Sequence, residues 1–165
     1  MISLKKASLN DLDQNWISWL NDKDVNFYSK KKFKKHTLFS QKNFLKKILD
    51  SKNKQLFMIT YKKKNIGNIL ISKISKKKDN CEISYMIGAK NLWNKNIGTK
   101  TISLISEHIF NELKINNIYA GTRSDNYASQ RILIKNKFKL VKTIKKDVKE
   151  NNSLFDRLIF QKTNK

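Results

Sequence analysis

The sequence is short of several residue types, and each shortage narrows what the protein can be. Its 165 residues include no proline, four glycines and a single cysteine, Cys81. A lone cysteine excludes an internal disulfide. No apolar run reaches the ~18 residues of a membrane-spanning helix, and the first residues turn polar at once, unlike a secretory signal. We therefore expect a cytoplasmic protein that does not enter a membrane.

Acidic residues are also scarce: 13 Asp and Glu stand against 36 Lys and Arg, for a formal net charge of +23. Such a charge is typical of nucleic-acid-binding proteins. However, the lysines fall in separate polar stretches, at 30–35, 62–64 and 76–78, rather than beside aromatic residues on one element. The abundance of Lys, Asn and Ile favours codon bias as the source of the charge. We do not expect a nucleic-acid partner, although a positive field attracts any phosphorylated ligand.

The hydrophobic pattern predicts a single mixed α/β domain over residues 1–165. Strands are expected at Ile2–Lys6, Gln55–Tyr61, Ile66–Ile74, Cys81–Ile87, Asn117–Gly121, Phe138–Lys145 and Ser153–Gln161. Helical turns or helices are expected after a cap at Ser8, at Asp22–Tyr28, after Thr37, at Ile97–Leu113 and at Asn126–Asn136. This order predicts a mixed, mostly antiparallel sheet of six to seven strands with helices on both faces.

The crossover from residues 81–87 to residues 117–121 forms a βαβ unit, whose ligands bind beyond the carboxyl end of the first strand. That place is occupied by Trp93-Asn94-Lys95-Asn96-Ile97-Gly98-Thr99-Lys100. The start of a helix offers free backbone N–H groups to a phosphate. The turn before it needs left-handed backbone, which Asn tolerates better than most residues other than glycine. The segment is therefore a candidate phosphate-binding turn, and an ordinary loop with a helix cap is the alternative.

These residues resemble the GNAT superfamily of acetyltransferases. Its signature turn, Gln/Arg-x-x-Gly-x-Gly/Ala, lies between the fourth strand and the next helix, and one branch often has Trp-Gly-Lys-Gly-Ile-Gly-Thr there. Residues 93–99 match this pattern apart from Asn at positions 94 and 96. A second family motif is matched by Asn126-Tyr127-Ala128-Ser129, then Leu133 and Lys137-Phe138, with Lys137 in place of glycine. Residues 19–25 with 33–37 are similar to a branch of sugar-modifying members.

The resemblance implies an N-acetyltransferase in which a primary amine attacks acetyl-CoA directly. The residues that it assigns to the cofactor are Tyr85, Met86, Ile87, Trp93, Asn94, Lys95, Asn96, Ile97, Gly98, Thr99, Lys100, Asn126 and Ser129. The apolar side chains of residues 85–87 are equally consistent with a core strand, and Asn126 is equally consistent with a helix cap. One cysteine and two distant histidines do not have the spacing of zinc ligands, so no metal is expected.

Proton transfer would need a base, and two residues are candidates. Glu82 shares one face of its strand with Ser84 and Met86, where a carboxylate could accept the amine proton. An ion pair with a lysine is the structural alternative. His36 has an imidazole suited to proton transfer near neutral pH, and a loop position before a cap at Thr37 is its alternative. At the position where many family members have a tyrosine acid, this chain has Leu133.

The acceptor is less constrained than the cofactor. Residues 19–37 resemble branches that acetylate an amino sugar, often nucleotide-linked, in surface-glycan biosynthesis, and this is the expected acceptor. A protein N-terminus of the ribosomal type is the nearest alternative. Polyamines fit less well, because a positive field repels them unless the site is locally acidic. From another class, a basic nucleic-acid-binding module or a non-catalytic GNAT-like domain stays open, and a homodimer is a candidate assembly.

Overall fold

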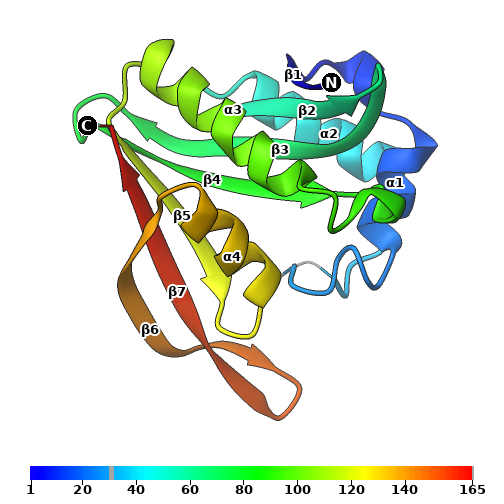
Figure 1. The fold of residues 1–165 in the computed structure, drawn as a ribbon. Helices are drawn as coiled ribbons and strands as arrows, with labels where there is room; N and C mark the ends of the chain where they lie inside the picture. Colours follow the sequence, from blue (N-terminus) through cyan, green and yellow to red (C-terminus); the bar gives the residue numbers. More distant parts are fainter. Residues whose placement is uncertain (30–31, 165) are drawn as a thin grey trace. The chain divides into compact units, whose positions relative to one another are not determined.

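The computed structural model describes residues 1–29 and 32–164; Lys30 and Lys31, the first residues of the polar stretch 30–35, lie outside the described residues. The strands are β1 (Ile2–Lys6), β2 (Gln55–Tyr61), β3 (Lys64–Ser75), β4 (Asn80–Ile87), β5 (Asn117–Arg123), β6 (Lys139–Glu150) and β7 (Ser153–Thr163). The helices are α1 (Gln14–Asn21), α2 (Leu38–Leu49), α3 (Ile97–Asn111) and α4 (Tyr127–Lys135), with short 3₁₀ turns η1 (Leu9–Asp11) and η2 (Lys90–Leu92). Figure 1 follows them along the chain.

The described strands form one sheet in the order β1-β2-β3-β4-β5-β7-β6. The pairs β1–β2, β2–β3, β5–β7 and β6–β7 are antiparallel. β4 and β5 are parallel, because the connection through α3 returns the chain to the same end of the sheet. The predicted fold class, a mixed and mostly antiparallel sheet with helices between strands, is confirmed.

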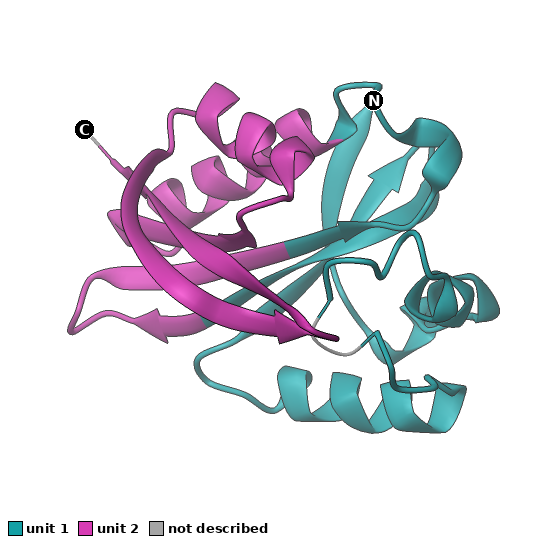
Figure 2. Ribbon diagram, turned by 90° about the horizontal axis from the view of Figure 1, so that it is seen from below, with its two compact units in different colours: residues 1–72, 85–97 teal, residues 73–84, 98–165 magenta. Residues whose placement is uncertain are grey.

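The chain divides into two compact units, drawn in different colours in Figure 2. Unit 1 comprises residues 1–72 and 85–97, and unit 2 comprises residues 73–84 and 98–165. β3, β4 and α3 each run from one unit into the other. The single domain expected over residues 1–165 stays a prediction.

Unit 1 is organised around a cluster of buried apolar side chains from its helices and first strands. Its buried members are Ala7, Trp16, Leu45, Ile48, Leu56 and Met58. Two caps start the helices that contribute to it: Asp13 accepts from the backbone N–H of Trp16 at 2.8 Å, and Thr37 accepts from that of Ser40 at 3.1 Å. The expected cap at Thr37 is confirmed.

The helical segment after β1 is divided into two pieces. Ser8 starts η1, with its backbone N–H and its hydroxyl both donating to Asp11 Oδ2 at 2.8 and 2.9 Å, so the expected helical turn after a cap at Ser8 is confirmed. α1 begins separately after Asp13, a second helix-capping residue five positions further along, and carries Trp16 and Trp19.

Unit 2 is built on the inner face of α3 and on β5. Ile102, Ile105 and Ile109 on α3 and Ile118 on β5 are completely buried. α4 packs against β5, and β6 and β7 form an antiparallel hairpin. β6 is the edge strand and is exposed along most of its length.

Positions that need a left-handed backbone are filled by Lys, Asn and Asp. Among the described residues, none of the glycines has positive φ, whereas ten other residues do: Lys62, Lys63, Lys73, Asp79, Asn94, Asn96, Lys114, Lys137, Lys146 and Asn151. The hairpin between β2 and β3 turns at residues 62 and 63, where two left-handed residues match the twist of the flanking strands. Because the chain has few glycines, lysines occupy several positions with positive φ, at which their Cβ atoms make the backbone conformation less favourable.

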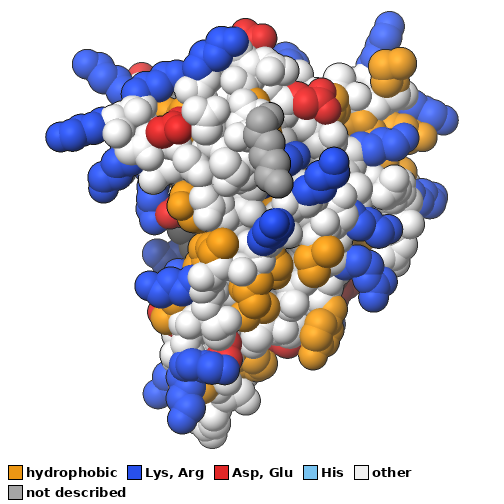
Figure 3. All heavy atoms as spheres, turned by 60° about the vertical axis from the view of Figure 1, so that its left-hand side comes forward, with side chains coloured by type: hydrophobic (Ala, Val, Ile, Leu, Met, Phe, Trp, Pro, Cys, Tyr) orange, Lys and Arg blue, Asp and Glu red, His pale blue; other side chains and the backbone are white. Residues whose placement is uncertain are grey.

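The basic side chains are dispersed. Figure 3 shows Lys and Arg side chains spread over the visible face, with hydrophobic side chains between them. Dispersal of this kind agrees with the separate lysine stretches noted in the sequence. Within residues 1–29 and 32–164, every helix is too short or too polar to span a lipid bilayer.

One of the left-handed lysines lies directly after the C-terminal end of α4. Lys137 has φ 66° and donates its backbone N–H to the carbonyl of Ile134 at 2.9 Å, while Phe138 donates to Leu133 at 3.1 Å. These two bonds define a helix C-terminal motif whose left-handed position is usually glycine. Leu133 and Phe138 are both buried, as the hydrophobic contact of this motif requires.

We predict that Lys137→Gly raises the stability of the protein by about 1 kcal/mol, because glycine has no Cβ to penalise the left-handed backbone. In a chain of this size the melting temperature should rise by about 2–4 °C. Arg131→Gly is the matched control, since it places glycine in the middle of the same helix and should lower stability by a similar amount. A melting temperature for Lys137→Gly at or below that of the wild type would contradict the prediction.

Candidate functional site

The segment between β4 and α3 forms a turn with two left-handed residues. Asn94 has φ 61° and Asn96 has φ 62°, and α3 begins at Ile97. The predicted use of asparagine at left-handed positions is thus confirmed. Gly98 lies in the first turn of α3, is buried and does not have positive φ. A left-handed backbone is therefore not the reason for glycine at this position.

Hydrogen bonds from the preceding residues hold this turn in place. The indole Nε1 of Trp93 donates to the carbonyl of Ile87, the last residue of β4, at 2.9 Å. The backbone N–H groups of Leu92 and Trp93 donate to Ala89 and Lys90, each at 3.0 Å. Trp93 therefore connects the end of β4 to the start of the turn, and its ring is 39% exposed.

Lys90 joins the same loop to the segment after α1. Its Nζ lies 2.7 Å from Asp22 Oδ2 and 3.0 Å from Asp24 Oδ2. These hydrogen bonds raise the pKa of Lys90 and hold the pKa of Asp22 below its usual value. Asp22 also accepts from the backbone N–H groups of Asp24 and Val25, at 2.9 and 3.2 Å. The two ion pairs of Lys90 therefore hold the beginning of the segment 22–28 in place within unit 1.

Two glycines of unit 1 allow close approaches along β4. A Cβ at Gly67 would lie 2.1 Å from the carbonyl oxygen of Met86, and one at Gly88 would lie 2.0 Å from the Trp19 ring. Each of these positions therefore excludes any other residue without a shift of its neighbours.

The candidate cofactor residues of β4, Tyr85, Met86 and Ile87, are all half-buried, and Met86 packs against the core cluster of unit 1.

The pairing of β4 with β5 stops before either strand ends. The parallel ladder runs from Asn80–Asn117 to Ile83–Ala120, although β4 continues to Ile87 and β5 to Arg123. In a βαβ unit, the carboxyl ends of parallel strands are where ligands bind.

The start of α4 follows β5 directly. Asn126 caps this helix, accepting from the backbone N–H of Ser129 at 3.1 Å. Of the two roles that the sequence allowed for Asn126, the structure shows the helix cap. The cap places Asn126 next to Ser129, and both belong to the residues predicted to bind the cofactor. Gln130 Nε2 donates to the carbonyl of Ser124 at 2.8 Å and steadies the same connection.

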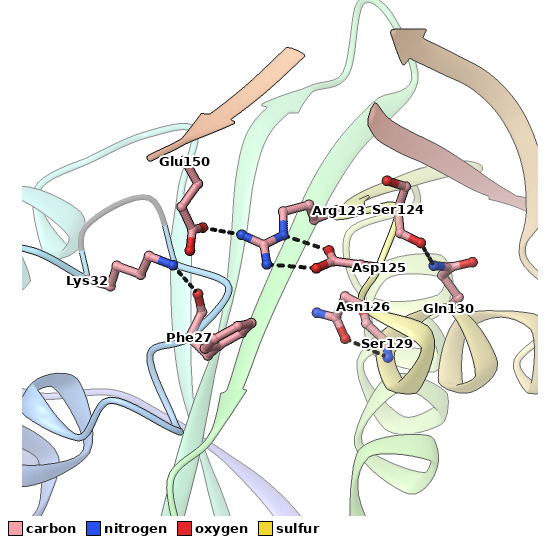
Figure 4. A network of polar contacts seen from close by, with 9 residues as sticks. All are labelled: Phe27, Lys32, Arg123, Ser124, Asp125, Asn126, Ser129, Gln130 and Glu150. Carbon is pink, nitrogen blue, oxygen red and sulfur yellow. Dashed lines mark hydrogen bonds and ion pairs between the residues drawn. The ribbon is translucent and has the colours of Figure 1, made fainter. Parts of the chain in front are cut away.

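A buried arginine in unit 2 was not anticipated from the sequence. Arg123 Nε and Nη2 donate to the two carboxylate oxygens of Asp125 at 2.6 and 2.8 Å, and Nη1 donates to Glu150, as Figure 4 shows. The guanidinium lies 4.2 Å from the centre of the Phe155 ring. The hydrogen bonds with Asp125 raise the pKa of Arg123, although burial acts in the opposite direction. Because Glu150 is 27 positions away, only the spacing of Arg123 and Asp125 was visible in the sequence.

The two predicted bases lie in different surroundings. Glu82, in unit 2, forms an ion pair with Lys73 Nζ at 2.6 Å, and its side chain is 45% exposed. This ion pair is the structural alternative that the sequence allowed. His36, in unit 1, is buried: its Nδ1 lies 2.8 Å from Gln41 Nε2, and its Nε2 is buried with no hydrogen-bond partner among the described residues.

The backbone of His36 is held on both sides by one asparagine. Its N–H donates to Asn21 Oδ1 and its carbonyl accepts from Asn21 Nδ2, both at 2.8 Å. Asn21 is the last residue of α1, and Thr37 caps α2 directly after His36. The position of the imidazole is therefore fixed by both helices.

Similarity to known proteins identifies the family to which this chain belongs. A family model described as an acetyltransferase (GNAT) domain matches residues 2–139. The chain belongs to the GNAT family of acetyltransferases. It is therefore an acyltransferase with acetyl-CoA as co-substrate. None of the curated protein sequences matches the chain.

Solved structures share the GNAT fold over nearly the whole chain. An acetyltransferase (GNAT family) from Bacillus anthracis is 20% identical, with a TM-score of 0.82 over 98% of this chain and 94% of that one. Spermidine N-acetyltransferase from Vibrio cholerae, in complex with CoA and spermine, is 15% identical, with a TM-score of 0.87 over 98% and 95%. RimL, a ribosomal L7/L12 alpha-N-protein acetyltransferase in complex with coenzyme A, is 14% identical, with a TM-score of 0.89 over 98% and 93%.

Two side chains of this GNAT protein limit its chemistry. Leu133, at the position of the family's usual tyrosine acid, is 1% exposed and has no ionisable group. Burial raises the pKa of the Cys81 thiol to about 12, so that Cys81 is protonated at neutral pH and is not a nucleophile. The described residues contain no group of three or more His, Cys, Asp or Glu side chains placed to hold a metal.

We predict that Asn96→Val weakens CoA binding, because a β-branched residue is strongly disfavoured at φ 62°. A left-handed penalty of roughly 1–2 kcal/mol corresponds to about a 5- to 30-fold loss of affinity in isothermal titration calorimetry. Asn96→Gly is the matched control and should bind CoA at least as tightly as the wild type. Equal affinities for the valine and glycine variants would show that the turn geometry does not govern binding.

Proposed function

We propose that residues 93–100 bind the pyrophosphate of acetyl-CoA and that the protein acetylates the primary amine of an amino sugar, nucleotide-linked, in surface-glycan biosynthesis. The observation that carries the cofactor assignment is the left-handed pair Asn94 and Asn96 leading into the first turn of α3. A turn of this shape directs backbone N–H groups towards an anion at the positive end of the helix dipole. Lys95 and Lys100 add positive charge to the same segment.

The residues present fit the co-substrate. The thioester supplies an activated acetyl group when acetyl-CoA is bound. The main chain of β4 beyond the end of its ladder with β5, at Met86, is assigned to the pantetheine arm. A backbone N–H there would stabilise the carbonyl oxygen as it gains negative charge. Asn126 and Ser129, at the first turn of α4 in unit 2, are proposed as cofactor residues on the family motif that they match.

For the proton of the attacking amine, the geometry favours His36 over Glu82. Nε2 of His36 is buried without a partner, while Nδ1 and the backbone are held by Gln41 and Asn21. A fixed imidazole with one nitrogen uncommitted can exchange a proton with a substrate or with water. The Glu82 carboxylate is instead engaged by Lys73 Nζ at 2.6 Å.

No tyrosine acid is assigned to the leaving thiolate, because Leu133 occupies that position and is buried. A thiol has a pKa of about 8.5, so the thiolate can leave near neutral pH without a protonating side chain. The proposed mechanism therefore needs one proton acceptor, at the amine, and no dedicated acid.

The acceptor assignment is supported by an exposed group of aromatic residues in unit 1, which we call the aromatic cluster: Phe27, Tyr28 and Phe33. Phe27 and Tyr28 meet edge to face at 4.9 Å, and Lys32 Nζ lies 4.8 Å from the Phe27 ring centre and 5.4 Å from that of Phe33. Exposed aromatic faces can stack on a nucleotide base. The Lys32 ammonium donates to the backbone carbonyl of Phe27 at 2.9 Å and adds positive charge to the cluster. A nucleotide-linked amino sugar combines a base and anionic phosphates with a primary amine.

We predict that His36→Asn lowers kcat by about 10²- to 10⁴-fold, the usual contribution of a general base, while CoA affinity stays within twofold of the wild type. Asparagine can replace the Nδ1 contact with Gln41 but not Nε2. Glu82→Gln is the matched comparison, and its kcat should stay within a few-fold of the wild type. If Glu82→Gln loses activity and His36→Asn keeps it, Glu82 is the base. The measurement is steady-state kinetics with thiol detection, over pH 6–9.

We predict that purified protein with acetyl-CoA transfers acetyl groups to UDP- or CMP-linked amino sugars more efficiently, in kcat/KM, than to spermidine or to a peptide bearing a ribosomal-protein N-terminus. Phe27→Ala should raise the KM for the nucleotide sugar without changing the melting-temperature rise caused by acetyl-CoA. Preference for the peptide would favour the N-terminal acetyltransferase alternative. A missing thermal shift at millimolar acetyl-CoA would instead favour a non-catalytic domain, since a ligand selective for the native state stabilises it.

A further inference from the structure

One lysine of unit 2 has its amine beside aromatic rings rather than beside a carboxylate. Lys162 is a half-buried residue of β7, and its Nζ lies 5.6 Å from the centre of the Phe110 ring and 5.9 Å from that of Phe138. Lys162 pairs with Ile118 on β5, which is completely buried, and paired residues of an antiparallel ladder share one face of the sheet. The amine therefore lies in largely apolar surroundings.

This arrangement differs from that of the lysines that carboxylates hold. Lys73 Nζ lies 2.6 Å from Glu82, and Lys145 Nζ lies 2.8 Å from Asp156. In the described part of the chain, Lys162 Nζ makes neither a hydrogen bond nor an ion pair, and it is not one of the fully buried polar atoms there. The amine therefore keeps surface that a reagent in solution can touch.

The surroundings of Lys162 favour its neutral amine over its ammonium form. Burial lowers the pKa of Lys162 below its usual value; the nearby Glu107 raises it, and Lys137 lowers it further. A lysine becomes a nucleophile when it is desolvated by apolar groups or lies close to another cation. Lys162 meets both conditions, through the rings of Phe110 and Phe138 and through Lys137.

We infer that the ε-amine of Lys162 is a site of acetylation by free acetyl-CoA. The neutral amine attacks the thioester carbonyl, so that the Nζ–C bond forms and the C–S bond breaks. The nitrogen gives up a proton to water, and CoA leaves as a thiolate that takes a proton from water. The product is a neutral amide in place of a partly desolvated cation.

The acetyl donor comes from solution rather than from the cofactor site of the same chain. Lys162 lies opposite Ile118, near the start of β5, whereas the ligands of a βαβ unit bind at the carboxyl ends of its parallel strands. The modification therefore goes beyond the proposed function and does not depend on the cofactor turn.

The test is incubation of the purified protein with acetyl-CoA at about pH 8, followed by mass spectrometry of the acetylated fraction of each lysine over time. Lys162 should react at least about threefold faster than Lys139 and Lys142, exposed lysines of the adjacent strand β6. In guanidinium chloride, the three should react at equal rates because the surroundings of Lys162 are lost. The preference should shrink as the pH rises, since an ordinary lysine loses its proton near pH ~10.4.

Variants test the cause of the preference. Lys137→Gln should slow the acetylation of Lys162 by about twofold or more, because it removes the neighbouring cation. Lys135→Gln removes the same charge from the end of α4 and is the matched control, with a rate unchanged from the wild type. Phe110→Ala should also slow the reaction, because water then solvates the ammonium. Asn96→Val should acetylate Lys162 at the wild-type rate.

Each outcome decides between the proposals. Acetylation of Lys162 no faster than that of Lys139, or a preference that persists in guanidinium chloride, would overturn the inference. So would equal rates in Lys137→Gln and Lys135→Gln. Slower acetylation in Asn96→Val would show that the catalytic site modifies Lys162, which would overturn direct reaction with free acetyl-CoA. A wild-type protein that binds no CoA but still acetylates Lys162 first would overturn the cofactor turn alone. If Phe110→Ala does not fold, the pair of glutamine variants gives the answer.

Discussion

The left-handed backbone at Asn94 and Asn96 is the constraint on which the proposed site depends. It brings the chain from the end of β4 into the first turn of α3, where a helix start has backbone N–H groups without intrahelical partners. Trp93 secures the turn by bonding to the last carbonyl of β4, and Lys90 connects the same loop to Asp22 and Asp24. The turn keeps its conformation with one glycine because asparagine can adopt it at modest cost.

Two groups of carboxylates hold basic side chains at the ends of structural elements. Asp22 and Asp24 hold Lys90 in unit 1, and Asp125 and Glu150 hold Arg123 in unit 2. Exposed ion pairs contribute little to stability. Arg123 differs because its side chain is 5% exposed, so loss of either carboxylate would leave a buried charge poorly compensated. The ion pair between Arg123 and Glu150 connects the end of β5 to the end of β6.

Residues with a local signal were predictable. The α2 cap at Thr37, the left-handed asparagines and the order of strands and helices all follow from neighbouring residues, so pattern and propensity suffice. Ser8 and Asp13 are both good caps within a few residues of each other, and each starts its own helical piece, η1 and α1. The Arg123–Glu150 contact and the buried Nε2 of His36 involve partners or burial that no local pattern encodes.

The sequence by itself determined the family, the candidate phosphate-binding turn and the approximate bounds of the secondary structure, because these depend on short-range spacing and on residue types. Only the tertiary structure decided that Glu82 is tied to Lys73 and that His36 is enclosed with one nitrogen uncommitted. It also decided that Lys162 lies beside the rings of Phe110 and Phe138. Burial and strand register arise from packing between segments far apart in the chain, and the turn between β4 and α3 acquires its surroundings only when that packing is complete.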